Sequence, residues 1–332
     1  MKIINAGYEI MNDTGDMFKN IERVARVCYK SEDKICEGSA QKMVRSLVMR
    51  NHEAMLEHQD LIFRFNDKAG YIIFMMYCSY LRSKTGFNCM LRTTYYDRGV
   101  VSGNVRMWRD FIRASLSMMN DLKSNKVMKM PKIIADLLSY KKLWPILFDD
   151  IDLGIDEYTD FDSYEFIPIT KDELTEEEKL VHYTVTVKFT VDIGVGREIT
   201  RHRVASFAQE STRYCNYTKD GFGNEITVIE PCFFDKGSEA YDAWKDGCLK
   251  AERAYITLID LHCTPQQARD VLPLSTKSEL VMTATFSEWQ HFFRLRALDA
   301  TGSAHPQIKE VAVPLLEEMK ILHPGSFAHL VK

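Results

Sequence analysis

The segment YTVTVKFTV, at residues 183–191, alternates apolar and polar side chains without interruption. A period of two residues predicts a β-strand with one buried face, because successive side chains of a strand point to opposite sides of the sheet. Other parts of the chain carry apolar residues at helical spacing instead. This mixture of strand and helix patterns favours an α+β fold.

Apolar spacing and capping residues predict the other elements. Helices are expected over about 15–29, 39–50, 102–116, 133–148, 239–262, 265–271, 288–298 and 306–322, with a short helical stretch at 197–202. Strands are expected within 1–12 and over 61–65 and 278–285. Ser102 and Ser287 are expected to cap the helices that follow them, and Pro314 should strain the last helix.

Residues 67–180 differ in character from the segments that flank them. They contain a dense apolar stretch and then, over 149–178, 13 acidic residues with one lysine, a block typical of a solvated linker or surface helix. We therefore expect a body made of residues 1–66 and 181–332, with 67–180 as a largely helical insertion of unassigned role. The strands 61–65 and 183–191 would then pair across the insertion, because the entropy of closing a loop grows only logarithmically with its length.

The composition is that of a soluble globular protein. The chain has 332 residues, which is about two domains' worth, and 45% of them are hydrophobic. We expect no membrane span, since the apolar runs are shorter than about 20 residues, and no signal peptide, so the cytosol is the expected location. A net charge of −4 disfavours a nucleic-acid-binding protein, which usually has a basic excess.

Several common site types are disfavoured by residue spacing. No two of the eight cysteines have C-x-x-C spacing, so we expect reduced, mostly buried thiols and no metal ribbon. His52-Glu53 and His58 do not have the spacing of a zinc hydrolase. Gly194-Val195-Gly196 lacks the third glycine of a dinucleotide fingerprint, because Ile199 stands there.

The most unusual segment is RHRVASFAQESTRY, at residues 201–214. Its three arginines, Arg201, Arg203 and Arg213, carry planar guanidinium groups that bind phosphate or carboxylate with two hydrogen bonds. Ser211 could add a donor to a phosphate. The alternative interpretation is a basic surface turn whose charges are balanced by Glu198 and Glu210.

Two further arginines, Arg269 and Arg296, lie among apolar residues. An arginine in such surroundings needs an anionic partner, because an unpaired buried charge is costly. The partner would be a bound ligand or, in the alternative interpretation, a structural carboxylate. Asp270, Glu279 and Asp299 are the candidates for that carboxylate.

Four ordered blocks resemble the flavin-dependent thymidylate synthases. The blocks are His52-Glu53 with Leu56-Glu57-His58, Arg201–Ser211 with Thr212-Arg213-Tyr214, Ala268–Leu274, and Phe292–Arg296 with Ala304–Gln307. The resemblance covers about 1–66 and 181–332 and implies an antiparallel or mixed sheet with flanking helices. The chain departs from the family pattern at Glu198, Ala208 and Gln209, and at Thr285 and Ser287 near the expected flavin.

The resemblance implies synthesis of dTMP from dUMP. Methylenetetrahydrofolate would supply the carbon, and FAD reduced by NADPH would supply the hydride. These ligands are anionic, which agrees with the concentration of arginines in three short segments. The family also implies a homotetramer with sites shared between subunits. A relative that binds nucleotide and flavin but has lost turnover is the alternative.

The site residues implied by the resemblance fall into two sets. The dUMP contacts would be Glu198, Arg201, Gln209, Ser211, Thr212, Arg213, Arg269 and Arg296. The FAD contacts would be His58, Arg201, His202, Arg203, Val204, Gln209 and His291, with His58 and His291 near the flavin or the folate.

Three of these residues are the candidates for direct participation in catalysis: Arg296, Ser211 and Arg213. Arg296 would polarise the uracil, and Arg213, with Arg269, would hold mainly the phosphate. Ser211 is expected to be a positioning donor and not a nucleophile, because no base oriented by a third group is evident beside it. Cys215 is expected to be structural.

Overall fold

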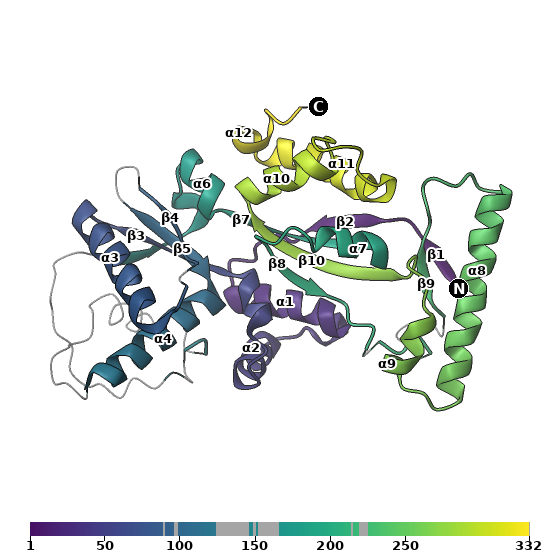
Figure 1. Cartoon of the computed structure of the whole chain (residues 1–332), viewed down its shortest axis with the longest axis horizontal. Coiled ribbons are helices and arrows are strands. Elements are labelled where there is room, and N and C mark those ends of the chain that lie inside the picture. The colour runs from purple at the N-terminus through teal and green to yellow at the C-terminus, as the bar shows by residue number, and fades with distance from the viewer. Residues whose placement is uncertain are drawn as a thin grey trace. The chain divides into compact units, whose positions relative to one another are not determined.

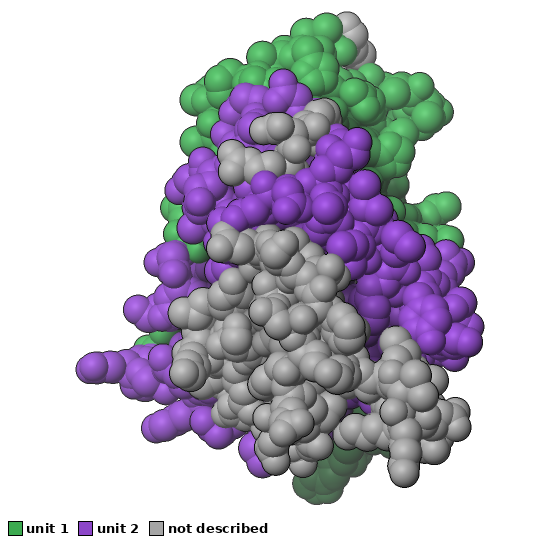
Figure 2. Space-filling model, turned by 90° about the vertical axis from the view of Figure 1, so that its left-hand side faces the viewer, with its two compact units in different colours: residues 1–13, 23–35, 185–332 green, residues 14–22, 36–184 purple. Residues whose placement is uncertain are grey.

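A computed structural model describes residues 1–88, 90–95, 99–123, 146–148, 151, 166–213, 215–218 and 225–331. The chain forms two compact units, which Figure 2 colours green and purple. Unit 1 consists of residues 1–13, 23–35 and 185–332, and unit 2 consists of residues 14–22 and 36–184. These boundaries differ from the division at residues 66 and 181 that the sequence suggests, since residues 36–66 join the segment that follows them.

Unit 1 is built on a four-stranded sheet in the order β2-β7-β10-β8 (Figure 1). Its strands are β2 (Gly7–Ile10), β7 (Thr184–Asp192), β10 (Lys277–Thr285) and β8 (Ser206–Gln209). A separate parallel pair joins β1 (Lys2–Ile4) to β9 (Thr227–Ile229). The helices that lie within this unit are α7 (Ile193–Ile199), α8 (Glu239–Asp260), α9 (Pro265–Ala268), α10 (Phe286–Arg296), α11 (Pro306–Leu322) and α12 (Pro324–Phe327), with short 3₁₀ turns η1 (Glu32–Lys34) and η6 (Arg269–Val271).

The alternating segment is β7, as the sequence predicts. Its odd-numbered apolar residues are buried, and Val187, Phe189 and Val191 are fully buried. Helices α10 and α11 lie on one face of this sheet (Figure 1), and aromatic residues of α10 pack against β7. The ring of Trp289 lies 6.3 Å from that of Phe189, and its indole donates to the carbonyl of Val185. Burial of this aromatic layer holds the helices on the sheet.

Unit 2 has its own sheet, in the order β4-β5-β3-β6. The strands are β4 (Arg92–Thr94), β5 (Val100–Asn104), β3 (Asp60–Phe65) and β6 (Phe166–Ile169). The helices within the unit are α2 (Ser39–Met49), α3 (Lys68–Thr85), α4 (Val105–Lys123) and α6 (Glu176–His182), with 3₁₀ turns η2 (Glu53–His58) and η4 (Lys171–Glu173). Helix α1 (Met17–Tyr29) contributes residues to both units.

The expected pairing of strands 61–65 and 183–191 is wrong. β3 is hydrogen-bonded to β5 along one edge and to β6 along the other, so it has no free edge for β7. β7 pairs with β2 instead. The segment 67–180 therefore contributes strands as well as helices, and its strands complete the sheet around β3.

Two predicted helix starts are also corrected. Residues 100–104 are strand, so α4 begins at Val105, and Asn104 caps it by accepting from the amide of Met107 at 2.8 Å. Strand β10 runs directly into α10, so the cap is Thr285, two residues before Ser287. Most of the helix predicted over 133–148 lies outside the described residues.

The acidic block is not wholly solvated where it is described. Glu178 is buried and accepts from Arg64 at 2.9 Å.

His182, on the same helix α6, is fully buried, with ring nitrogens 2.7 Å from the Ser102 hydroxyl and 2.8 Å from the Thr94 hydroxyl. Burial lowers the pKa of His182 to about 3, so its imidazole is neutral at pH 7.

Candidate active site

A cavity of about 630 Å³ opens in unit 1 beside the end of β8. It is lined by Ile193, Arg197, Gln209, Glu210, Ser211, Thr212, Arg269, Asp270, Leu272, Pro273, Leu274 and Ser278. Four of the residues that the sequence assigns to dUMP therefore meet at one cavity: Gln209, Ser211, Thr212 and Arg269.

The sheet and helix α7 position the polar wall of this cavity. β8 pairs antiparallel with β10, and the amide of Gln209 donates to the hydroxyl of Ser278 at 3.0 Å. Asp192 begins α7 by accepting from the amide of Val195 at 2.6 Å. A Cβ at Gly196 would approach the Gln209 amide nitrogen to 3.3 Å, so a glycine lets the helix lie close to the end of β8.

Two arginines give the cavity its cationic character. Among the described residues, the side chains of Arg197 and Arg269 form no hydrogen bond or ion pair. The interpretation of Arg269 as part of a structural ion pair is therefore wrong for the part of the chain that is described. A half-buried guanidinium beside the hydroxyls of Ser211 and Thr212 suits an anionic ligand such as a phosphate.

Arg197 is a site residue that sequence reasoning missed. It lies four residues after Ile193 on α7, so both side chains face the cavity. The signal was present, because Asp192 is a helix-capping residue type directly after a strand pattern. A helix start at residue 193 in place of 197 would have put Arg197 on the site-facing side.

A second cluster forms around Arg296 on α10. Its guanidinium donates to the Glu198 carboxylate at 3.2 Å, to the Glu198 carbonyl at 3.3 Å and to Nε2 of His202 at 3.2 Å. The carboxylate partner of Arg296 is thus Glu198, not Asp299 or the other two carboxylates proposed from the sequence. Glu198 belongs to α7, the same helix that presents Arg197 to the cavity.

His202 is buried next to this guanidinium and two rings. Its ring centroid lies 5.0 Å from that of Phe292 and 5.8 Å from that of His291. Burial, with the neighbouring Arg296 and His291, lowers the pKa of His202 to about 4. The imidazole is therefore neutral at pH 7 and accepts from Arg296.

The other predicted residues lie in different surroundings. Arg201, Arg203 and Val204 are exposed in the turn after α7, and within the described chain the two arginines form no side-chain hydrogen bond or ion pair. Arg213 is exposed and donates to Gln266 at 3.2 Å. His58 is buried in η2 of unit 2.

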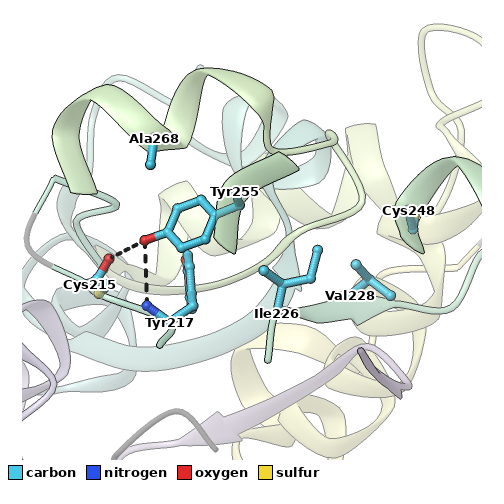
Figure 3. Close-up of a cluster of buried hydrophobic side chains, with 7 residues drawn as sticks. All are labelled: Cys215, Tyr217, Ile226, Val228, Cys248, Tyr255 and Ala268. Atoms are coloured by element: carbon cyan, nitrogen blue, oxygen red, sulfur yellow. Dashed lines mark hydrogen bonds between the residues drawn. The ribbon is translucent and has the colours of Figure 1, made fainter. Parts of the chain in front are cut away.

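Cys215 has the environment of a structural thiol. It belongs to the buried cluster drawn in Figure 3, in which the Tyr255 hydroxyl donates to the Cys215 carbonyl at 3.4 Å and accepts from the amide of Tyr217 at 3.5 Å. Burial, with the neighbouring Glu210, raises the pKa of the thiol to about 12. A protonated, buried thiol is a poor nucleophile.

Two features, a metal site and a membrane-spanning helix, are absent from the described residues. No group of histidine, cysteine and acidic side chains among them could hold a metal ion. None of their helices is long and apolar enough to cross a membrane.

Comparison with known proteins points to one family. Residues 173–325 match the family model described as thymidylate synthase complementing protein. The flavin-dependent thymidylate synthase of Pyrococcus furiosus is 33% identical over 147 residues, which cover 43% of this chain and 57% of that protein. The enzyme of the same name from Geobacter sulfurreducens is 30% identical over 130 residues, covering 39% and 53%.

Residues 173–325 of the chain are thus similar to the flavin-dependent thymidylate synthases. The matched region contains every predicted site residue except His58, and it spans little more than half the length of these curated relatives. A solved UMP/dUMP methylase, PolB from Streptomyces cacaoi bound with 5-Br dUMP, aligns over 99% of this chain and 96% of its own, with 16% identity and a TM-score of 0.40. That score is too low to establish a shared arrangement.

Proposed function

We propose that this protein is a flavin-dependent thymidylate synthase that converts dUMP to dTMP. Methylenetetrahydrofolate would supply the carbon, and NADPH would reduce the bound FAD. The observation that carries the proposal is the cavity wall, where Arg197 and Arg269 lie next to Ser211 and Thr212 without a carboxylate partner in the described chain. This wall combines charge and hydrogen-bond donors in the manner that a nucleotide phosphate requires.

The roles of the dUMP contacts follow from their chemistry. Arg269 and Arg213 would bind the phosphate, and Ser211 and Thr212 would donate to it or to the sugar. Gln209 would add a polar contact beside the base. Ser211 has no base oriented to activate it, so we assign it to positioning.

Arg296 would act on the uracil ring together with Glu198. A fixed guanidinium near the pyrimidine oxygens stabilises the negative charge that develops as C5 becomes nucleophilic. The neutral His202 accepts from this guanidinium without adding positive charge. Arg296 is thereby oriented before the substrate binds, which lowers the entropic cost of the reaction.

The residues around α10 and the turn after α7 fit a flavin dinucleotide. Arg201 and Arg203 are exposed cations suited to a pyrophosphate, and the rings of His202 and His291 suit the edge of an aromatic system. Val204 belongs to the same turn, and the resemblance adds His58 to the proposed flavin or folate contacts. When bound, FAD supplies the hydride.

The cellular setting is part of the proposal. We propose a cytoplasmic homotetramer whose subunits share sites, as the resemblance implies. The alternative, a nucleotide- and flavin-binding relative without turnover, would have the same arginines.

The decisive experiment uses the purified full chain under anaerobic conditions. With FAD, NADPH and methylenetetrahydrofolate, the protein should release tritium from C5 of labelled dUMP and form dTMP. A yellow protein that is bleached by NADPH and binds dUMP, but releases no tritium, would establish the alternative. A protein that binds neither flavin nor dUMP would refute both.

A further inference from the structure

Glu210 places a buried carboxylate in the wall of the cavity, which the exposed Asp270 also lines. The side chain of Glu210 is only 2% exposed, and its backbone amide donates to the carbonyl of Glu279 at 2.8 Å. An uncompensated carboxylate here would repel a phosphate, because a charge acts over a long range in a site shielded from water.

Two lysines lie against this carboxylate. Lys277 Nζ lies 2.9 Å from Oε2 of Glu210 and 3.1 Å from Glu279. Lys30 Nζ lies 3.7 Å from Glu210 and also forms an ion pair with Glu279. Lys30 Nζ lies at the same distance, 3.7 Å, from the carboxylate of Glu32, whose side chain is 43% exposed. Both lysines thus contact Glu210 and Glu279, and their two positive charges balance the charges of these two carboxylates.

The pKa shifts of Lys30 and Glu279 agree with ionised pairs. Burial would lower the pKa of Lys30, but Glu210 and Glu279 outweigh burial and raise it. Burial would raise the pKa of Glu279, but Lys277 and Lys30 outweigh burial and lower it. The charges of Lys30 and Glu279 therefore persist at neutral pH.

The backbone conformation of Lys30 independently indicates that its side chain has a role that a glycine could not fill. This residue directly follows α1 and has a φ of 46°, in the left-handed region that favours glycine. Glycine would avoid the steric cost but would remove the side chain that reaches Glu210 and Glu279.

Glu210 also holds the turn that carries two cavity hydroxyls. Its second oxygen accepts from the thiol of Cys215 at 3.5 Å, and the amide of Cys215 donates to the carbonyl of Ser211 at 3.1 Å. The carboxylate therefore anchors the turn that presents Ser211 and Thr212, so the fold retains it although it carries the same sign of charge as the ligand.

We propose that Lys277 and Lys30 neutralise Glu210 in the wall of the cavity, together with Glu279, which contacts both lysines, and so determine the affinity of the cavity for a doubly charged phosphate ligand. These lysines are positioning residues that act through Glu210. The proposal deepens the proposed function and rests on it for the identity of the ligand. It predicts that affinity depends on the net charge of this group in both directions.

The test compares dUMP with deoxyuridine, which lacks the phosphate, by calorimetric titration of the full chain. Lys277→Met leaves the wall one charge more negative and should raise the Kd of dUMP about tenfold, with the Kd of deoxyuridine within about twofold of wild type. Glu210→Gln reverses the charge change and should lower the Kd of dUMP. The double variant Lys277→Met/Glu210→Gln restores the wild-type net charge of the group and should return the Kd of dUMP to within about twofold of the wild-type value.

The opposite directions of the two single variants keep the test informative if one variant folds poorly. Equal changes for dUMP and deoxyuridine, or weaker dUMP binding in Glu210→Gln, would overturn the proposal. Inorganic phosphate serves as a second probe, with the same order of affinities expected. If the wild type and its variants bind inorganic phosphate in that order of affinity but none of them binds dUMP, the proposed function fails. The proposal that the lysines neutralise Glu210 would then still hold.

Discussion

Arg296 donates from Nε to Nε2 of His202 across 3.2 Å, joining α10 to the turn after α7. Because the imidazole accepts at Nε2, its proton must be on Nδ1. The same guanidinium binds Glu198, so three residues from two distant segments hold one another in a single geometry. This geometry links the proposed uracil contact to the protonation state of a buried histidine.

His202 should remain neutral down to about pH 4. Its pKa is lowered on folding from 6.5 to about 4, so the unfolded chain binds more protons between these values. The contribution of His202 to stability is full above pH 6.5 and is lost as the pH falls toward 4, by about 3 kcal/mol in total. Nitrogen-15 spectra of the imidazole across this range would measure the pKa directly.

A matched variant separates the titration of His202 from that of His182, another buried histidine, whose pKa is lowered in the same sense. His202→Gln keeps an acceptor for Arg296 and removes the titration. Its free energy of unfolding should fall less steeply than that of wild type between pH 6.5 and 4 in denaturant titrations. Identical slopes for the two proteins would contradict the assigned pKa.

Replacement of Arg296 should affect turnover more than folding. Arg296→Lys keeps a charge but cannot reproduce contacts to both Glu198 and His202, so we expect kcat to fall about 100-fold. The midpoint of thermal unfolding should change by only a few degrees. A variant that lost structure and activity together would show that Arg296 is structural.

Replacement of Arg269 should weaken ligand binding without loss of stability. Within the described chain this side chain has no partner to leave unpaired, whereas a charge-assisted contact to phosphate is worth about 2 kcal/mol. Arg269→Ala should therefore raise the Kd of dUMP about 30-fold, since each 1.4 kcal/mol is about tenfold. Arg253→Ala, on the exposed side of α8, is the matched control and should bind dUMP as the wild type does.

Cys215 should be unreactive and dispensable for chemistry. Burial and Glu210 raise its pKa to about 12, whereas Cys36 is exposed. Under native conditions at pH 8, iodoacetamide should label Cys36 and spare Cys215, as peptide mass spectrometry would detect. Cys215→Ser, which keeps a donor for Glu210, should retain turnover within a few-fold; complete loss of turnover would argue for a covalent role.

The individual elements of this protein are largely set by local sequence. The alternation in β7 predicts its buried face, and the helix from Pro306 to Leu322 is found at the bounds that its spacing predicts. The cavity residues Gln209, Ser211 and Thr212 could be proposed from the sequence, because they lie at or directly after the end of one strand, β8. Such features depend on residues close in sequence, where the period and the cap carry the information.

Partners distant in the chain were decided only by the tertiary structure. Strand β3 pairs with β5 and β6 instead of β7. Arg296 forms an ion pair with Glu198, and Lys30, which follows α1, forms one with Glu210. A periodic pattern states which face of an element is buried but not against which other element, because strand pairing and ion pairing depend on how the whole chain packs. The sequence by itself therefore determined the elements and the reactive residue types, and long-range packing decided which of them share a site.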